Sequence, residues 1–128
     1  MIKETKKSKR IFFAILMIFI LLLIILGVSM IYNLFFNINT VANGDYLESL
    51  KSPNNEFTLN AYFIDGGSLS GDAIRVELIN NQNSNKKNIY WDYPKSNVSM
   101  KWIYENTVEI NGKVLNIYKD TYDWRKNN

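Results

Sequence analysis

The chain has 128 residues, with 15 Lys and Arg, 12 Asp and Glu, and a formal net charge of +3. It contains no cysteine and no histidine, which excludes disulfide bonds, Cys/His zinc sites, thiol nucleophiles and every histidine-based catalytic triad. A chain of this length holds one small domain.

An uninterrupted apolar run begins at Ile11 and ends at Val28, and the next four residues extend it to Tyr32. A helix over residues 11–32 rises about 33 Å, enough to cross a hydrocarbon core of about 30 Å. The alternative is a buried core helix, but a domain this small has no core able to surround a helix that is apolar on all faces. The run therefore predicts a transmembrane helix over residues 11–32.

The charges before this run predict its orientation. Residues 1–10 carry five cations and one anion, and a positively charged flank stays in the cytoplasm. We expect a basic cytoplasmic tail in contact with membrane lipid and a C-terminal domain outside the cytoplasm. A cleaved signal peptide is the alternative, but the run exceeds the usual apolar stretch of about 7–15 residues. The nearest small-residue cleavage candidate, Thr40-Val41-Ala42, lies well beyond it, so the pattern favours an uncleaved signal anchor in the cell membrane.

Residues 33–52 are punctuated by asparagine and glycine and are expected to form a stalk. Within it, Asp45 to Lys51 is predicted as a short helix that ends before Ser52-Pro53, because the residue preceding a proline avoids the helical region.

From Ser52 onward the hydrophobic pattern has a period of two, which is typical of half-buried strands. The alternation predicts strands over residues 57–63, 74–78, 89–93 and 98–102. We therefore expect an N-terminal transmembrane α-helix followed by a small mainly-β extracytoplasmic domain over residues 53–125. That domain is predicted as an antiparallel meander of about five to six strands, with residues 126–128 as a tail.

The clearest local signal is Asn111-Gly112 between two apolar-alternating runs. Asn-Gly supports two positive φ angles and suits a type I′ hairpin. In a two-residue loop, Glu109 opposes Val114 and Val108 opposes Leu115. The residues predicted to share the core face are Val108, Ile110, Leu115 and Ile117.

Acidic residues offer weak candidates for chemistry. Asp65 and Asp72 flank a loop rich in glycine and serine and are candidate contacts for a ligand or partner. The loop lacks the Gly-Lys-Ser/Thr ending of a phosphate loop. Asp92, Asp120 and Asp123 would be the carboxylates of a cell-wall hydrolase, but that chemistry needs two carboxylates at a defined separation in a sugar-sized cleft. We therefore expect no enzymatic activity, no bound metal and no cofactor.

Tyrosine and tryptophan gather in the last third of the chain. Trp91, Tyr93 and Trp102 share the parity of the apolar positions and are predicted to lie in the core. Tyr90 and Tyr104 are predicted to be exposed, where aromatic side chains would contact a partner.

The hypothesis that remains is a binding or interaction module at the cell envelope, whose partner is an envelope or secreted protein. A sharper alternative is an immunity protein that guards its own membrane against a secreted toxin, and a third is the carboxylate-based hydrolase. A nucleic-acid partner is not expected, because the basic residues adjoin the membrane helix and residues 33–128 hold ten cations and eleven anions.

Five segments carry a family resemblance: Ser52–Tyr62, Asp65–Gly67, Asn88–Tyr93, Trp102–Gly112 and Asp120–Asp123. Together they resemble the domain of unknown function 5412 family, small proteins of low-GC Gram-positive bacteria that often carry an N-terminal membrane or lipoprotein anchor. The resemblance covers roughly residues 52–125 and implies no activity and no site residues. This chain has no anchor cysteine, so the lipoprotein variant does not apply.

Overall fold

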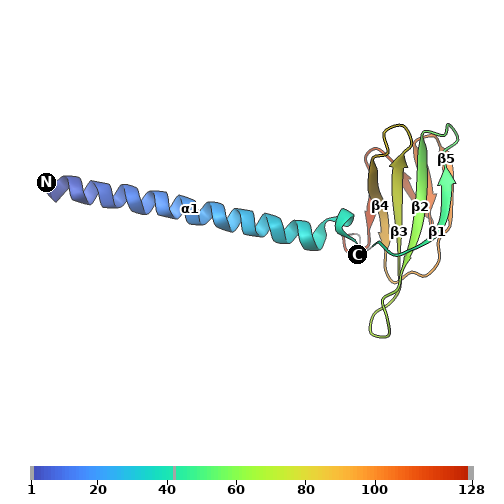
Figure 1. The fold of residues 1–128 in the computed structure, drawn as a ribbon, viewed down its shortest axis with the longest axis horizontal. Coiled ribbons are helices and arrows are strands. Elements are labelled where there is room, and N and C mark those ends of the chain that lie inside the picture. The colour runs from blue at the N-terminus through green and yellow to red at the C-terminus, as the bar shows by residue number, and fades with distance from the viewer. Residues whose placement is uncertain (1, 42, 127–128) are drawn as a thin grey trace. The chain divides into compact units, whose positions relative to one another are not determined.

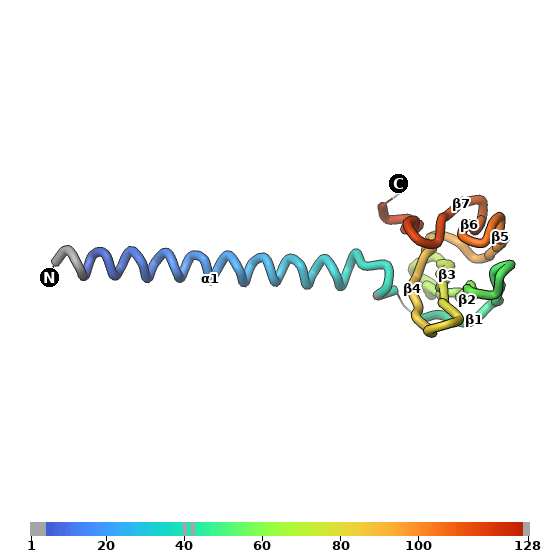
Figure 2. The backbone as a smooth tube through the Cα atoms, turned by 90° about the horizontal axis from the view of Figure 1, so that it is seen from above, coloured from blue at the N-terminus to red at the C-terminus, as the bar shows by residue number. Residues whose placement is uncertain are grey.

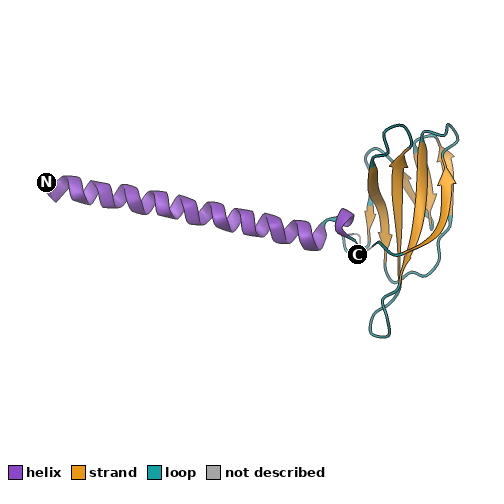
Figure 3. Cartoon of the chain, in the orientation of Figure 1, coloured by secondary structure: helices purple, strands orange, loops and turns teal. Residues whose placement is uncertain are grey.

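The computed structural model describes residues 2–41 and 43–126, and the chain divides into two compact units, Met1–Thr40 and Val41–Asn128. The first unit holds helix α1 (Ile2–Phe36) and the short 3-10 helix η1 (Ile38–Thr40). In the second unit the described residues form eight strands in two sheets (Figures 1 and 3). The predicted fold class, a long apolar helix followed by a mainly-β domain, is confirmed.

Helix α1 runs without a break from the basic segment through the apolar run, so it extends beyond the predicted residues 11–32 at both ends. Its large apolar side chains are exposed along its length, and by length and composition the helix is sufficient to cross a membrane. Near its end, the Asn33 side-chain amide donates a hydrogen bond to the Ser29 carbonyl at 3.0 Å. This polar side chain is therefore satisfied within the helix itself.

The larger sheet has five strands in the order β1-β2-β3-β4-β8. Its neighbours are antiparallel except for β4 and β8, which pair in parallel through two residues each. The strands are β1 (Asp45–Lys51), β2 (Phe57–Ile64), β3 (Ala73–Asn80), β4 (Lys86–Asp92) and β8 (Tyr122–Asp123).

The smaller sheet has three antiparallel strands in the order β5-β6-β7, namely β5 (Met100–Tyr104), β6 (Thr107–Ile110) and β7 (Lys113–Asn116). It forms a second layer over one face of the larger sheet, as Figure 2 shows. The core between the layers joins one face of each sheet. Its members are Phe57, Leu59, Ala61, Ile74, Val76, Leu78, Ile89, Tyr90, Val108, Ile110, Leu115 and Ile117.

The hairpin prediction is confirmed in its register. Glu109 pairs with Val114 and Val108 with Leu115, and the φ angles of Asn111 and Gly112 are +46° and +82°. Val108, Ile110, Leu115 and Ile117 are all buried, so this face lies in the core as predicted.

The predicted short helix over Asp45–Lys51 is wrong, because this segment is strand β1. Its backbone pairs with β2, with Leu50 opposite Leu59 and Lys51 opposite Thr58. A helix of seven residues is not stable alone, whereas the edge of a sheet supplies a partner for every second backbone group. The β domain therefore begins near Asp45 rather than at residue 53, and β1 and β8 bring the strands to eight instead of five or six.

The two valines of the hairpin test this two-layer arrangement with matched chemistry. Val108 is completely buried and Val114 is 57% exposed. We expect Val108→Ala to lower the free energy of unfolding by about 2 kcal/mol, since two buried methyl groups are lost and a cavity remains. Val114→Ala should change it by less than about 0.5 kcal/mol. Urea titration of the detergent-solubilised chain by tryptophan fluorescence measures both, and equal effects would contradict the assigned faces.

Candidate binding hollow at one end of the sandwich

The connections of the sandwich gather at two ends. Strand β1 begins at one end, here called the base, where the loop of residues 65–72 and the Asn111-Gly112 turn also lie. The opposite end, here called the tip, carries the turns over residues 52–56, 81–85 and 105–106. The antiparallel order of the strands fixes this separation, because alternate connections must fall at opposite ends.

A hollow of about 630 Å³ opens at the tip. Its volume falls within the range of about 300–1,000 Å³ that is common for ligand pockets. Three turns of the chain that are distant in sequence contribute to it. The lining residues are Pro53, Asn54, Glu56, Ile103, Tyr104, Glu105, Asn106 and Tyr118.

A β-bulge in strand β5 exposes two residues that line the hollow, Ile103 and Tyr104. Neighbours on a regular strand face opposite sides of the sheet. In β5 the register shifts between Trp102 and Tyr104, so Ile103 and Tyr104 are both exposed, at 39% and 68%. Bulges re-aim side chains in this way next to functional sites.

Tyr118 reaches the hollow from a braced turn that follows β7. The Asn116 side chain accepts a hydrogen bond from the Tyr118 backbone N–H at 2.9 Å, and the Asp120 carboxylate accepts one from the Asn116 N–H at 2.9 Å. The preceding Ile117 is buried in the core and bonds to the Asn106 carbonyl. Tyr118 is therefore held 65% exposed, with its ring edge-to-face against Phe57 at 5.9 Å.

The turn over residues 52–56 is equally well defined. The Ser52 hydroxyl accepts a hydrogen bond from the Phe57 N–H at 3.0 Å and donates one to the Asn54 side chain at 2.7 Å. The same Asn54 oxygen accepts from the Glu56 N–H at 3.2 Å. These bonds within the turn fix the backbone from which Glu56 projects.

The charge of the hollow is entirely negative. Glu56 and Glu105 are the charged residues of its lining, and neither forms an ion pair within the described part of the chain. Two lysines, Lys86 and Lys87, line a smaller neighbouring hollow that shares Tyr118. The ammonium of Lys87 there donates to the Ile117 carbonyl at 2.7 Å.

The structure places the predicted contact residues apart. Tyr104 is exposed as predicted and lies in the hollow. Asp65 and Asp72 lie in the base loop, where the Asp65 carboxylate accepts from the Gly67 N–H at 2.8 Å and the Asp72 carbonyl accepts from the Lys95 N–H. These aspartates therefore belong to the opposite end of the domain from Tyr104.

The predicted exposure of Tyr90 is wrong, because its side chain is completely buried. The register shifts between β3 and β4, so that Val76 pairs with Tyr90 while Glu77 pairs with Asn88. The extra residue, Ile89, reverses the parity of the rest of the strand. Tyr90 consequently faces the core and stacks on Tyr122 at 5.2 Å.

The bulge also moves Trp91 from the predicted core to the outer face, where it pairs with Arg75.

Burial and the nearby Asp92 raise the pKa of the Tyr90 hydroxyl, although the hydrogen bond with Asn111 acts in the opposite sense. The hydroxyl therefore stays protonated and donates to Asp92 at 2.9 Å. Trp102 does pack against the core, as predicted.

The three aspartates considered for hydrolysis do not share a site. Asp92 lies opposite Ile74 on the core side, whereas Asp123 lies opposite Trp91 on the outer face. Burial would raise the pKa of Asp123, but two hydrogen bonds and the charge of Arg125 outweigh it and lower that pKa. Asp120 braces the Tyr118 turn. Across the described residues, no group of three or more acidic side chains is arranged to hold a metal ion.

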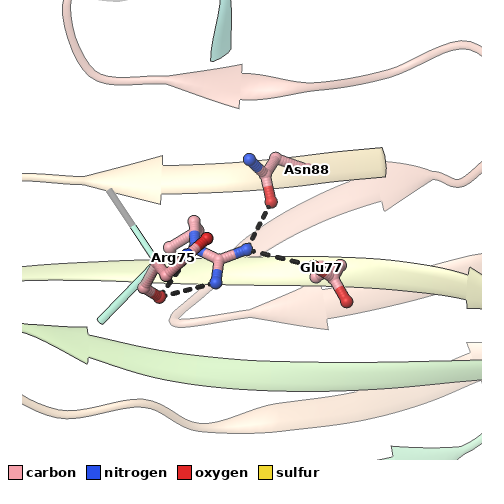
Figure 4. A network of polar contacts seen from close by, with 4 residues as sticks. Arg75, Glu77 and Asn88 are labelled. Carbon is pink, nitrogen blue, oxygen red and sulfur yellow. Dashed lines mark hydrogen bonds and ion pairs between the residues drawn. The ribbon is translucent and has the colours of Figure 1, made fainter. Parts of the chain in front are cut away.

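A second polar cluster lies on the outer face of the larger sheet and is centred on the buried Arg75 (Figure 4). Its guanidinium donates to Asn88 at 2.8 Å, pairs with Glu77 at 3.2 Å and donates twice to the Asn43 carbonyl. It also covers the Tyr62 ring at 4.1 Å. Every guanidinium nitrogen of Arg75 has an acceptor in this cluster, and Arg75 itself is buried, so the arginine is not available to an external ligand.

Sequence reasoning identified Tyr104 but missed the other residues of the hollow. Pro53-Asn54-Asn55 and Glu105-Asn106 are turn sequences that lie between predicted strands. They were the signal from which these two turns could have been predicted. No local sequence pattern indicates that these two turns lie together with Tyr118.

A β-sandwich domain preceded by a long apolar helix is the class that this architecture defines. The model of a family of unknown function (DUF5412) matches residues 7–127. The chain therefore belongs to that family, and the match extends the resemblance seen in residues 52–125 through most of the helix. No curated protein and no solved structure matches the chain.

The Arg75 cluster gives a second stability prediction. Arg75→Ala should lower the free energy of unfolding by about 3 kcal/mol, because it leaves the Glu77 carboxylate, whose side chain is only 15% exposed, without its cation. One Glu77 oxygen already lacks a hydrogen-bond partner. Adding Glu77→Ala should restore part of the loss, which a double-mutant cycle in urea measures. The exposed Lys101→Ala serves as the control, and a neutral Arg75→Ala would refute this account.

Proposed function

We propose that this protein is a single-pass membrane protein with a cytoplasmic N-terminus, and that its β domain is a non-enzymatic binding module of the cell envelope whose contact surface is the hollow at the tip. The observation that carries the proposal is the hollow itself. It combines exposed aromatic rings with carboxylates on braced turns, at the end of the domain opposite the start of β1.

The anchoring part of the proposal is supported by the length and apolar character of α1 and by the five cations that precede its apolar stretch. A charge pattern of this kind keeps the N-terminal flank in the cytoplasm. The cations also attract anionic lipid headgroups, with about 1 kcal/mol for each cation near the surface.

The binding part is supported by the arrangement of the tip residues. Exposed tyrosines supply a large contact area at a low cost in side-chain entropy, and tyrosine is enriched among the residues that dominate binding energy. The three hydrolase candidates are engaged elsewhere, as turn brace, ion pair and hydrogen-bond acceptor. Binding is therefore the function that the geometry supports best.

The absence of cysteine makes the orientation directly testable. Leu69 is fully exposed in the base loop, and Ser8 lies in the basic segment before the apolar run. We expect Leu69→Cys to react with a membrane-impermeant maleimide in intact cells and Ser8→Cys to react only after lysis. The reverse pattern would refute the orientation, and loss of residues 1–40 from the isolated chain would refute the uncleaved anchor.

The contact surface is tested by site-specific crosslinking in living cells. A photo-crosslinking amino acid at Asn106, in the hollow, should trap a discrete partner of the full-length chain. The same amino acid at Leu69, at the base, should not trap it. Because Tyr104 contributes an exposed ring, Tyr104→Ala should reduce the Asn106 crosslink severalfold. Equal crosslinking from both positions would remove the tip as the contact surface. A secreted toxin as the trapped protein would favour the immunity alternative.

A further inference from the structure

The residues of the hollow can be compared with two clusters in which the domain holds its own arginines. Arg75 lies over the Tyr62 ring at 4.1 Å and pairs with Glu77. Arg125 lies over the Trp91 ring at 4.4 Å and pairs with Asp123 at 2.7 Å. In both cases a cation is held between an aromatic face and a carboxylate.

Each of these clusters has three components: an aromatic ring, a carboxylate and a cation. The hollow at the tip contains the first two. Tyr104 and Tyr118 supply exposed aromatic rings, and Glu56 and Glu105 supply carboxylates. The third component is missing, because the lining contains no lysine or arginine and neither glutamate is ion-paired within the portion that the structure describes.

We propose that the hollow binds a cationic side chain, lysine or arginine, presented by a basic polypeptide partner. This inference rests on the proposed function, since it names the class of partner for the same surface. An ammonium or guanidinium group is attracted to the face of a tyrosine ring. It also forms charge-assisted hydrogen bonds with carboxylates, which are stronger than neutral ones.

Charge complementarity distinguishes this partner from the others. An acidic polypeptide would bring like charges together at Glu56 and Glu105, which opposes association. A neutral saccharide would stack on the tyrosines and donate hydroxyl hydrogen bonds to the glutamates, but it carries no positive charge to neutralise the two carboxylates. The Asn106 side-chain oxygen accepts one hydrogen bond, from the Thr107 hydroxyl at 3.1 Å, and so has capacity to accept a second from an N–H group of a guanidinium.

The test is calorimetric titration of the full-length chain, held in nanodiscs of zwitterionic lipid, with three probes. These are an octapeptide of alternating lysine and glycine, the same peptide with glutamate in place of lysine, and a neutral chitooligosaccharide. The zwitterionic lipid removes attraction of the basic peptide to the bilayer. Residues 1–10 are basic and could themselves bind the glutamate peptide. The titration with that peptide is therefore repeated on a variant in which all five cations of this segment are replaced, and only binding that persists is attributed to the β domain.

We expect the lysine peptide to bind, and the variant E56Q/E105Q to weaken its affinity at least about fivefold at low salt. The affinity of the unaltered chain should fall as salt rises, because the carboxylates are accessible to solvent. The variant E48Q/E109Q, which removes the same charge from positions outside the hollow, should bind as the unaltered chain does. Thermal unfolding of all variants confirms that they remain folded.

The outcomes separate this inference from the proposed function. If the lysine peptide binds E56Q/E105Q as tightly as the unaltered chain, the cationic partner is refuted, and the Asn106 crosslink alone decides the proposed function. If only the saccharide or the acidic peptide binds, and Tyr104→Ala abolishes that binding, the cationic partner is refuted while the hollow remains a binding surface. If no probe binds but the Asn106 crosslink persists in cells, the cationic partner is likewise refuted. If the Asn106 crosslink is also absent, both fail.

Discussion

Burial of the apolar face of the five-stranded sheet beneath the smaller sheet β5–β7 is the interaction on which the rest of the domain depends. The apolar face of a sheet has to be buried against another element for a domain to be stable. The β6–β7 hairpin supplies the cover, because its register places Val108, Ile110 and Leu115 on one side. The core is therefore made by two segments that are distant in sequence, and the connections between the layers have to lie at the two ends of the sandwich.

The outer face of the larger sheet is stabilised by side chains that the strand register places next to one another, and not by a further layer of secondary structure within the β domain. One row of paired residues crosses all five strands: Tyr46, Tyr62, Arg75, Trp91 and Asp123. Aromatic rings flank the buried arginine in this row, and the Arg125 side chain covers Trp91. Cross-strand pairs of this kind stabilise a sheet face. They also explain how a face without a covering layer keeps a charged side chain buried.

The two ends of the sandwich differ in what they expose. At the base, the polar side chains largely serve the fold. Asn111 bonds to Tyr90 and to the Asn97 carbonyl, and Tyr93 accepts from the Gly71 N–H. At the tip, the turns are braced internally and leave two tyrosines and two glutamates accessible in one hollow. This asymmetry supports the proposal that the tip is the contact surface of the domain.

Local sequence was sufficient for features that depend on local physical chemistry. The apolar run of 11–32 determined a long helix, because no turn signal interrupts it, and Asn111-Gly112 determined its hairpin, because both residues accept positive φ. The period-two pattern located the strands of the meander. The absence of cysteine and histidine excluded their chemistry without any reference to the fold.

Tertiary structure decided what depends on pairing between distant strands. Asp45–Lys51 is a strand only because β2 offers it an edge, and Tyr90 is buried only because a bulge opposite Val76 and Glu77 shifts the parity of β4. The hollow exists only where turns near residues 53, 105 and 118 meet. A β-bulge and a contact between distant turns leave no periodic pattern in the sequence of one segment. Both depend on how two segments pack together, and not on the conformational preference of either segment alone.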